Sequence, residues 1–199
     1  MVLSSVVRQL WPALRAMLVL TVICGLAYPL ALTGFAQVAV HHKANGSLIK
    51  VDGKVVGSSL IGQSFDGKVQ YFQSRPSAAG DGYDPLASSA SNLGPNSPVL
   101  LKLVESRRKA AAALDGTNPA DVAPDALEAS GSGLDPDISP EYAAQQVARV
   151  ARVRGMSEDA VRRLVARYTQ GRMLGFLGEP AVNVLEVNLA LDRATGTAH

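Results

Sequence analysis

The sequence predicts an α+β fold, in which one N-terminal transmembrane helix precedes a mixed α+β domain outside the cytoplasm. Three observations carry this prediction. Residues 16–40 form a run of 25 residues without a charged side chain, residues 47–72 contain the turn signals of β structure, and later segments repeat apolar residues at helical spacing. Strands followed by helices are typical of an α+β domain.

The uncharged run at 16–40 is long enough to cross a bilayer. As a helix it spans about 37 Å, against a hydrocarbon core of about 30 Å. Pro29 lies near its middle and predicts a kink. The alternative is a cleaved secretory signal, whose apolar region is usually about 7–15 residues long and ends at a small-residue cleavage site. Because this run is longer and has no clear cleavage site, we expect a retained anchor.

The charges around this run predict its orientation. Arg8 and Arg15 precede it, and residues 1–40 contain no acidic side chain. The positive-inside rule then keeps residues 1–15 in the cytoplasm and places residues 41–199 in an extracytoplasmic domain. That domain has equal numbers of acidic and basic side chains, which argues against nucleic-acid binding, since nucleic acid selects basic stripes.

The first part of the domain carries strand and loop signals. Asp52-Gly53 predicts a two-residue hairpin turn, and a second Asp-Gly at 66–67 precedes the β-like segment KVQYF at 68–72. Residues 74–98 are rich in Gly, Pro, Ser and Asn and predict a long loop. Such a loop usually has a function or a partner, and the alternative is that it is disordered when alone.

Two Ser-Pro pairs predict the starts of helices, because serine caps a helix and proline suits its first position. The first, Ser97-Pro98, opens an apolar stripe that runs to about residue 114 and stops at Gly116. The second, Ser139-Pro140, opens a helix that ends at Gly155.

The end of the chain is less regular. Ser157 predicts the cap of a third helix, which we expect to end at Gly171. Residues 182–192 alternate apolar and polar side chains from Leu185 onward, which favours a strand, with a short helix as the alternative.

The stretch ASGSGLDPDISPE at 129–141 has the small residues of a phosphate-binding loop. A P-loop also requires a lysine after its last glycine, and this stretch has none. Pro136 stands where a dinucleotide-binding loop has its third glycine. From the residues alone we interpret the stretch as a structural turn, in which Gly131 and Gly133 supply backbone freedom.

The sequence offers no set of catalytic side chains. Cys24 lies in the uncharged run, and the three histidines are His41, His42 and His199, so no dispersed catalytic triad is available. The His41-His42 pair would need further ligands to hold a metal. We therefore expect no catalytic residue and no metal site, and do not expect this chain alone to be an enzyme.

Several long phrases occur in an order that identifies a family. Over about residues 10–192 the sequence resembles the C subunit of the bacterial Kdp potassium-transporting P-type ATPase, through YPLALTGFAQ (28–37), GSSLIGQSF (57–65), YFQSRPSA (71–78), SNLGPNSP (91–98), ASGSGLDPDISP (129–140) and LGFLGEPAVNVLEVNLALD (174–192). The resemblance implies a complex in the bacterial cytoplasmic (inner) membrane. Its other members are a channel-like K⁺-binding subunit, a P-type ATPase subunit that hydrolyses ATP with Mg²⁺, and a small peptide subunit.

The resemblance leaves two functions open for this chain. The first is a non-catalytic, single-pass subunit that is needed for assembly, stability and ATP-coupled K⁺ transport by its partners. The second is a catalytic chaperone that raises the ATP affinity of the P-type ATPase subunit by contributing to nucleotide binding. In this second account the nucleotide loop comprises Ser130, Gly131, Ser132 and Gly133.

Overall fold

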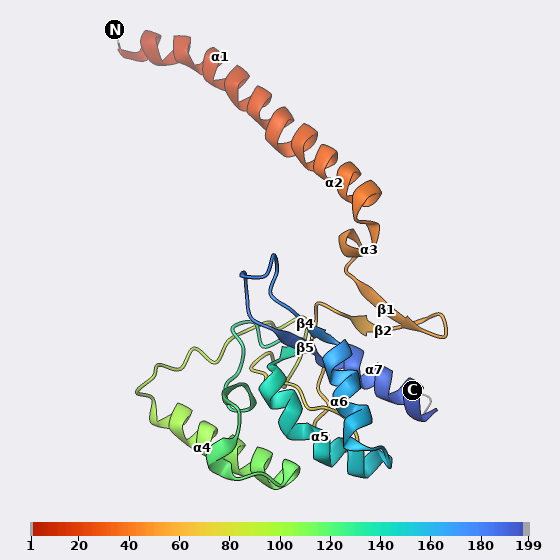
Figure 1. Cartoon of the computed structure of the whole chain (residues 1–199). Helices are drawn as coiled ribbons and strands as arrows, with labels where there is room; N and C mark the ends of the chain where they lie inside the picture. The colour runs from red at the N-terminus through yellow and green to blue at the C-terminus, as the bar shows by residue number, and fades with distance from the viewer. Residues whose placement is uncertain (1, 197–199) are drawn as a thin grey trace. The chain divides into compact units, whose positions relative to one another are not determined.

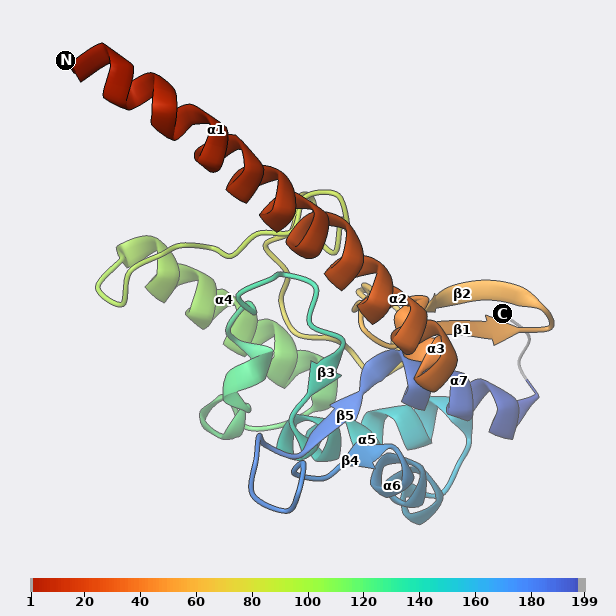
Figure 2. The same cartoon turned by 90° about the horizontal axis from the view of Figure 1, so that it is seen from above.

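The computed structural model describes residues 2–196, so Met1 and residues 197–199, with His199 among them, lie outside the described part. The chain divides into two compact units, Met1–Leu48 and Ile49–His199. Each unit is described by itself, and its elements are labelled in Figure 1 and, from above, in Figure 2.

The first unit is mainly one long helix. Its segments α1 (Val2–Leu20), the π-helical η1 (Thr21–Ala27) and α2 (Tyr28–Ala39) follow one another without a break, and the short α3 (His41–Ala44) comes after them. Within the described residues, Val7–Ala39 is the one helix that is long and apolar enough to cross a membrane, with 33 residues and a mean hydropathy of 2.1. The helix therefore begins well before residue 16, where the sequence placed the start of the span.

Pro29 is the second residue of α2, which directly follows the π-helical segment. Proline has no N–H, so a carbonyl of the preceding turn loses its usual partner. In η1 the backbone changes register instead, and the N–H of Tyr28 donates to the carbonyl of Ile23, five residues earlier. A π-helical turn is one of the known ways in which a helix accommodates such a break.

The second unit begins with the predicted hairpin. Strands β1 (Leu48–Val51) and β2 (Lys54–Ser58) form a two-stranded sheet. Asp52 and Gly53 both have positive φ, 51° and 79°, as the hairpin turn favoured by Asp-Gly requires. The prediction of this hairpin is confirmed.

The KVQYF segment at 68–72 is not a strand, and the prediction of β structure there is wrong. Side chains from the helices α5 (Pro140–Arg154) and α7 (Val184–Thr195) bond this part of the chain in place of a neighbouring strand. Gln146 accepts from the backbone N–H of Gln73 at 2.7 Å and donates to its carbonyl at 3.3 Å. Arg149 donates to the carbonyls of Val69 and Tyr71 and forms an ion pair with Asp115 at 2.6 Å. This segment, which turns at Val69 and Gln70, is thus fixed by a buried polar cluster.

The predicted helix starts are confirmed. Helix α4 (Pro98–Asp115) has Ser97 as its cap and ends at Gly116, which has a φ of 69°. Helix α5 (Pro140–Arg154) is capped by Ser139, whose Oγ accepts from the N–H of Tyr142 at 3.0 Å.

The third helix is shorter than predicted. Helix α6 (Glu158–Arg167) starts after Ser157, whose Oγ accepts from the N–H of Ala160, but it does not continue to Gly171. Tyr168 ends it because the next two residues enter the strand β4 (Thr169–Gln170).

A small antiparallel sheet joins distant parts of the domain. Its order is β3-β5-β4, with β3 at Asp137–Ile138 and β5 at Ala181–Asn183. Val182 lies opposite both Ile138 and Thr169. The short helices η2 (Pro119–Asp121) and η3 (Pro124–Ala126) lie between α4 and β3 in the chain.

Residues 184–195 form a helix, so the strand predicted at 182–192 is wrong beyond its first two residues. Helix α7 (Val184–Thr195) starts after Asn183, whose side chain accepts from the N–H of Glu186 at 3.1 Å. Eight of its twelve residues are buried, including the polar Asn188 and Asp192. A helix buried on most sides has no clear polar face, so its sequence need not show a helical period.

The core lies where the sheet meets the helices. Helix α5 packs between α4 and α6, α6 also packs against α7, and β5 contacts both α5 and α7 (Figures 1 and 2). The largest fully buried apolar side chains come from α5, α6, β5 and α7 and from the loop residue Phe72: Phe72, Val147, Val150, Val161, Val182, Val184, Val187 and Leu191.

Candidate functional site

The Ser/Gly loop, defined here as residues 129–135, connects η3 to β3, and the side chains of its two serines accept from N–H groups of the loop itself. The Oγ of Ser130 accepts from the N–H of Gly133 at 2.9 Å, and the Oγ of Ser132 accepts from the N–H of Leu134 at 3.1 Å. Phosphate-binding loops point such N–H groups outward at the ligand. Here these two N–H groups already have partners within the loop.

The carbonyl groups of the Ser/Gly loop bind the long loop at 74–98. The Oγ of Ser77 donates to the carbonyl of Gly133 at 2.6 Å. The carbonyl of Ser132 accepts from the Oγ of Ser88 at 2.9 Å and from the N–H of Ser89 at 3.0 Å. The Gly- and Ser-rich segment therefore has a partner within this chain, and the two loops fold against each other.

Gly133 is the residue at which the two loops approach most closely. It is buried, its φ is +69°, and a Cβ at this position would lie 2.7 Å from both the backbone N of Ala79 and the backbone O of Ser89. Gly131 differs, because it is exposed, does not have a positive φ, and has open space around it. Of the two glycines expected to supply backbone freedom, the structure requires only Gly133.

Ser77 and Tyr83 fix the long loop from inside. The Oγ of Ser77 accepts from the N–H groups of Ala79 and Tyr83, and the hydroxyl of Tyr83 donates to the carbonyl of Arg75 at 2.8 Å. Burial raises the pKa of Tyr83 to about 12, so the hydroxyl keeps its proton for this bond at neutral pH.

Acidic side chains lie at the end of the Ser/Gly loop and just after it. Asp135 forms an ion pair with Arg75 at 2.9 Å. The pKa of Asp137 is raised above its ordinary value, mainly by burial and then by the charge of Asp135, while the bond from Asn183 opposes this shift. This negative charge is unfavourable for a phosphate group at the same place.

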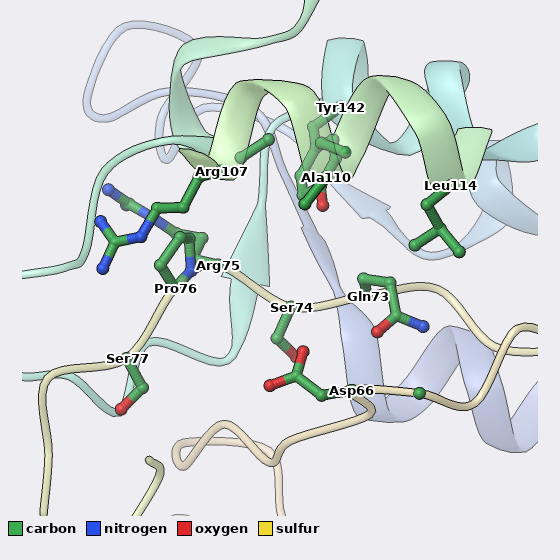
Figure 3. A pocket seen from close by; sticks show the side chains of 13 residues that line it. Asp66, Gln73, Ser74, Arg75, Pro76, Ser77, Arg107, Ala110, Leu114 and Tyr142 are labelled. Atoms are coloured by element: carbon green, nitrogen blue, oxygen red, sulfur yellow. The ribbon is translucent and has the colours of Figure 1, made fainter. Parts of the chain in front are cut away.

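A pocket of about 350 Å³ opens beside Arg75, between α4, α5 and the chain at 66–77 (Figure 3). Its wall combines two arginines with apolar and small polar residues. The lining residues labelled in Figure 3 are Asp66, Gln73, Ser74, Arg75, Pro76, Ser77, Arg107, Ala110, Leu114 and Tyr142.

Hydrogen-bond donors in this pocket have unused capacity. The buried Nε of Arg75 and the hydroxyl of Tyr142 have no hydrogen-bond partner among residues 2–196. Arg107 donates to the carbonyl of Leu127 at 2.8 Å, and burial lowers its pKa. These donors suit a carboxylate or another small anion, and the carboxylate of Asp66 on the opposite wall restricts the charge that fits.

The other candidate residues do not come together. Within residues 2–196 no group of three or more His, Cys, Asp or Glu side chains could hold a metal ion. His41 and His42 lie in α3 and Cys24 in η1, all in the first unit, and His199 lies outside the described residues. Ser130, Ser132 and Gly133 do meet, through the internal bonds described above.

Two features were not predicted from the sequence. Arg75, Arg107 and Tyr142 are far apart along the chain, and no local pattern brings them together. The run MLGFL at 173–177, by contrast, can be recognised in the sequence, because it places four large apolar residues in a short segment rich in glycine. In the structure these four side chains are exposed.

Comparisons with known proteins agree over almost the whole chain. Residues 10–193 match the family described as KdpC, the c chain of the K⁺-transporting ATPase. The potassium-transporting ATPase KdpC subunit of Kineococcus radiotolerans is 62% identical over 192 residues, which cover 96% of this chain and 97% of the relative. The subunits of the same name from Sorangium cellulosum and Methylococcus capsulatus are 56% and 55% identical, over 94% and 91% of this chain and 98% and 95% of the relatives.

Proposed function

Because the chain belongs to the KdpC family, the c chain of the K⁺-transporting ATPase, we propose that it is the non-catalytic assembly subunit of this pump. The chain is a subunit of a potassium-transport complex. In our proposal one span anchors it in the cytoplasmic membrane, with its N-terminus inside and its domain outside. The domain stabilises the complex, while a channel-like subunit binds K⁺, a P-type ATPase subunit hydrolyses ATP with Mg²⁺, and a small peptide subunit completes the assembly.

The bonding of the Ser/Gly loop is the observation that carries this proposal. Ser130 and Ser132 accept N–H groups of their own loop, and the carbonyls of Ser132 and Gly133 accept donors from the loop at 74–98. A loop with these bonds fixes the position of two segments that are about fifty residues apart. Such a role requires small residues, and it requires no ligand.

The competing function is a direct contribution to ATP binding by Ser130, Gly131, Ser132 and Gly133. Two features of the structure favour assembly over this alternative. The N–H groups of Gly133 and Leu134 are occupied, and Asp135 and Asp137 follow directly with negative charge. The orientation expected from Arg8 and Arg15 also puts the loop on the side of the membrane without ATP.

ATP titration of the purified complex separates the two functions. Gly131→Ala and Ser132→Ala change exposed loop positions, and Ser88→Ala is a matched control on the neighbouring loop. We expect all three complexes to keep K⁺-stimulated ATPase activity with an unchanged half-maximal ATP concentration. A rise of about tenfold for Gly131→Ala or Ser132→Ala, with assembly intact, would support the nucleotide-binding function instead.

A further inference from the structure

The pocket beside Arg75 carries charges of both signs. Its charged lining residues are Asp66, Arg75 and Arg107. The charge of Arg75 is paired with that of Asp135. In the described part of the chain neither Arg107 nor Asp66 forms an ion pair. Figure 3 shows Arg107 on α4 and Asp66 on the facing wall, so the pocket holds one cation and one anion that this chain leaves unpaired.

Arg107 is held at the pocket by the backbone of the chain. Its Nη1 donates to the carbonyl of Leu127 at 2.8 Å, beside the carbonyl of Glu128 to which Arg75 donates at 3.4 Å. The Nε and Nη2 of Arg107 have no acceptor among residues 2–196. Arg107 is half-buried, and burial lowers its pKa. A positive charge that is partly removed from water and has no carboxylate beside it favours an anion at this place.

The hydroxyl of Tyr142 is a second donor that lines this pocket. Only 5% of the surface of Tyr142 is exposed, and its hydroxyl has no hydrogen-bond partner within the described residues. Burial raises its pKa above the ordinary value, so the hydroxyl keeps its proton at neutral pH. A buried hydroxyl without a protein partner suits an acceptor oxygen of a ligand.

Gln73 adds an uncharged acceptor to the wall that carries Asp66. Its Nε2 donates to the carbonyls of Lys68 and Tyr71, at 3.0 and 3.1 Å. These two bonds fix the orientation of the amide, because only its nitrogen can donate to a carbonyl. The Oε1 has no donor in the part of the chain that the structure describes, and in Figure 3 it is the atom of this amide that lies towards Asp66. This wall therefore offers a carboxylate and an amide oxygen to a donor.

We propose that the pocket binds a small zwitterion that carries one carboxylate and one ammonium group, as an amino acid does. The carboxylate of the ligand accepts from Arg107 and from the hydroxyl of Tyr142. Its ammonium group donates to Asp66 and to the Oε1 of Gln73. The inference goes beyond the proposed function and is independent of it, since all four residues belong to the second unit of this chain.

The charges and the size of the pocket favour a zwitterion over other ligands. A simple anion would leave Asp66 unpaired and facing a like charge. A nucleoside triphosphate would bring several negative charges to a pocket with a single unpaired cation. The volume of about 350 Å³ is at the lower end of the range of about 300–1,000 Å³ for ligand pockets, and the side chains of Ala110 and Leu114 leave room for a short aliphatic part.

Calorimetric titration of the full chain in detergent tests the class of ligand. The zwitterionic probes are L-alanine and γ-aminobutyrate, in which the two charges lie close together or further apart. Propionate and propylamine carry only one charge each. We expect at least one zwitterion to bind with a Kd of about 1 mM or lower, at least about tenfold more tightly than either singly charged probe. Propionate that binds as tightly as both zwitterions, or no binding of either zwitterion up to about 10 mM, would overturn the proposal.

Tyr142→Phe separates binding from folding. The substitution removes a hydroxyl that has no partner in the described chain, so the Tm should not fall. The Kd of the zwitterion should nevertheless rise about five- to tenfold, because one hydrogen bond to its carboxylate is lost. Tyr168→Phe changes a half-buried tyrosine that does not line this pocket and is the matched control. An unchanged Kd for Tyr142→Phe contradicts the assigned carboxylate site.

Asp66→Asn tests the ammonium site. Asp66 is exposed, so its replacement should leave folding intact. The affinity for the zwitterion should fall about tenfold while that for propionate stays the same or rises, so the preference for the zwitterion should disappear. A variant that keeps this preference overturns the proposal.

Arg107→Gln tests the carboxylate site through its charge. We expect the zwitterion to bind at least about tenfold more weakly. Arg108→Gln is the matched control, because Arg108 is also half-buried on α4 and donates to one backbone carbonyl, that of Pro119, but does not line the pocket. Equal losses of affinity in the two variants would show that the effect is structural and contradict the proposal.

Discussion

The side-chain amide of Asn188 pairs with both backbone polar groups of Phe72. Its Oδ1 accepts from the N–H of Phe72 at 2.8 Å, and its Nδ2 donates to the carbonyl of Phe72 at 3.0 Å. Both residues are fully buried, and 116 positions separate them in the chain. One amide on α7 therefore does what a neighbouring strand would do for this segment.

Removing this amide should destabilise the domain strongly. Asn188→Ala leaves two buried backbone groups without partners, and each such group costs about 1–3 kcal/mol. We expect the free energy of unfolding to fall by about 2–5 kcal/mol in urea denaturation of the full chain in detergent. Arg193→Ala, at an exposed position of the same helix, should change it by no more than about 0.5 kcal/mol. Equal effects of the two substitutions would show that the amide pairing contributes little.

The two glycines of the Ser/Gly loop should respond differently to the same substitution. Gly133→Ala places a Cβ against the backbone of Ala79 and Ser89 at a φ of +69°. The strain and the overpacking together should cost about 2–5 kcal/mol. Gly131→Ala meets open space and should be nearly neutral. Thermal unfolding of both variants checks this, and a Gly133→Ala protein as stable as Gly131→Ala would be inconsistent with the close approach.

The sequence predicts the features of this fold that depend on local chemistry. The caps at Ser97, Ser139 and Ser157 and the turn at Asp52-Gly53 each arise from residues next to one another, so they can be read directly. The end of α6 at Arg167 is different, because β4 pairs with a strand about a dozen residues further on.

The features that depend on distant residues could not be predicted. The alternation in 182–192 suggests a strand, but α7 is buried on most sides and its polar Asn188 faces the backbone of Phe72. Likewise, nothing near residue 75 in the sequence indicates that Arg75 shares a pocket with Arg107 and Tyr142. For the candidate site, the sequence shows the composition of the Ser/Gly loop, but it does not show the bonds of this loop to the loop at 74–98.

The titration of Asp137 should make the domain less stable at neutral pH. Its pKa in the folded protein is raised above the ordinary 3.8, so the folded protein holds this proton more tightly than the unfolded chain. As pH rises from the ordinary value through the raised one, the contribution of Asp137 to stability therefore falls. Asp137→Asn mimics the protonated form, and its stability relative to the natural protein should be greater at about pH 7 than at about pH 3.5. A difference that is constant or shrinks as pH rises would contradict this.

The uncharged helix should be a retained anchor. Leu26→Arg places a charge in η1 and should cost about 2.5–3.5 kcal/mol of insertion free energy, whereas the apolar control Leu26→Phe should insert normally. Carbonate extraction of membranes measures the retained fraction, which should fall for the arginine variant only. Release of a natural chain that has lost its first 36–40 residues or so would identify a cleaved signal instead.

The side of the membrane on which the Ser/Gly loop lies tests our account most directly. Ser132→Cys, at an exposed position and in a Cys24→Ser background, is treated with a membrane-impermeant maleimide in intact cells that produce the whole complex. Gln9→Cys in the same background reports on the N-terminal side of the span. We expect Ser132→Cys to be labelled in intact cells and Gln9→Cys only after permeabilisation. Labelling of Ser132→Cys only after permeabilisation would place the Ser/Gly loop on the same side as ATP and contradict an external assembly role.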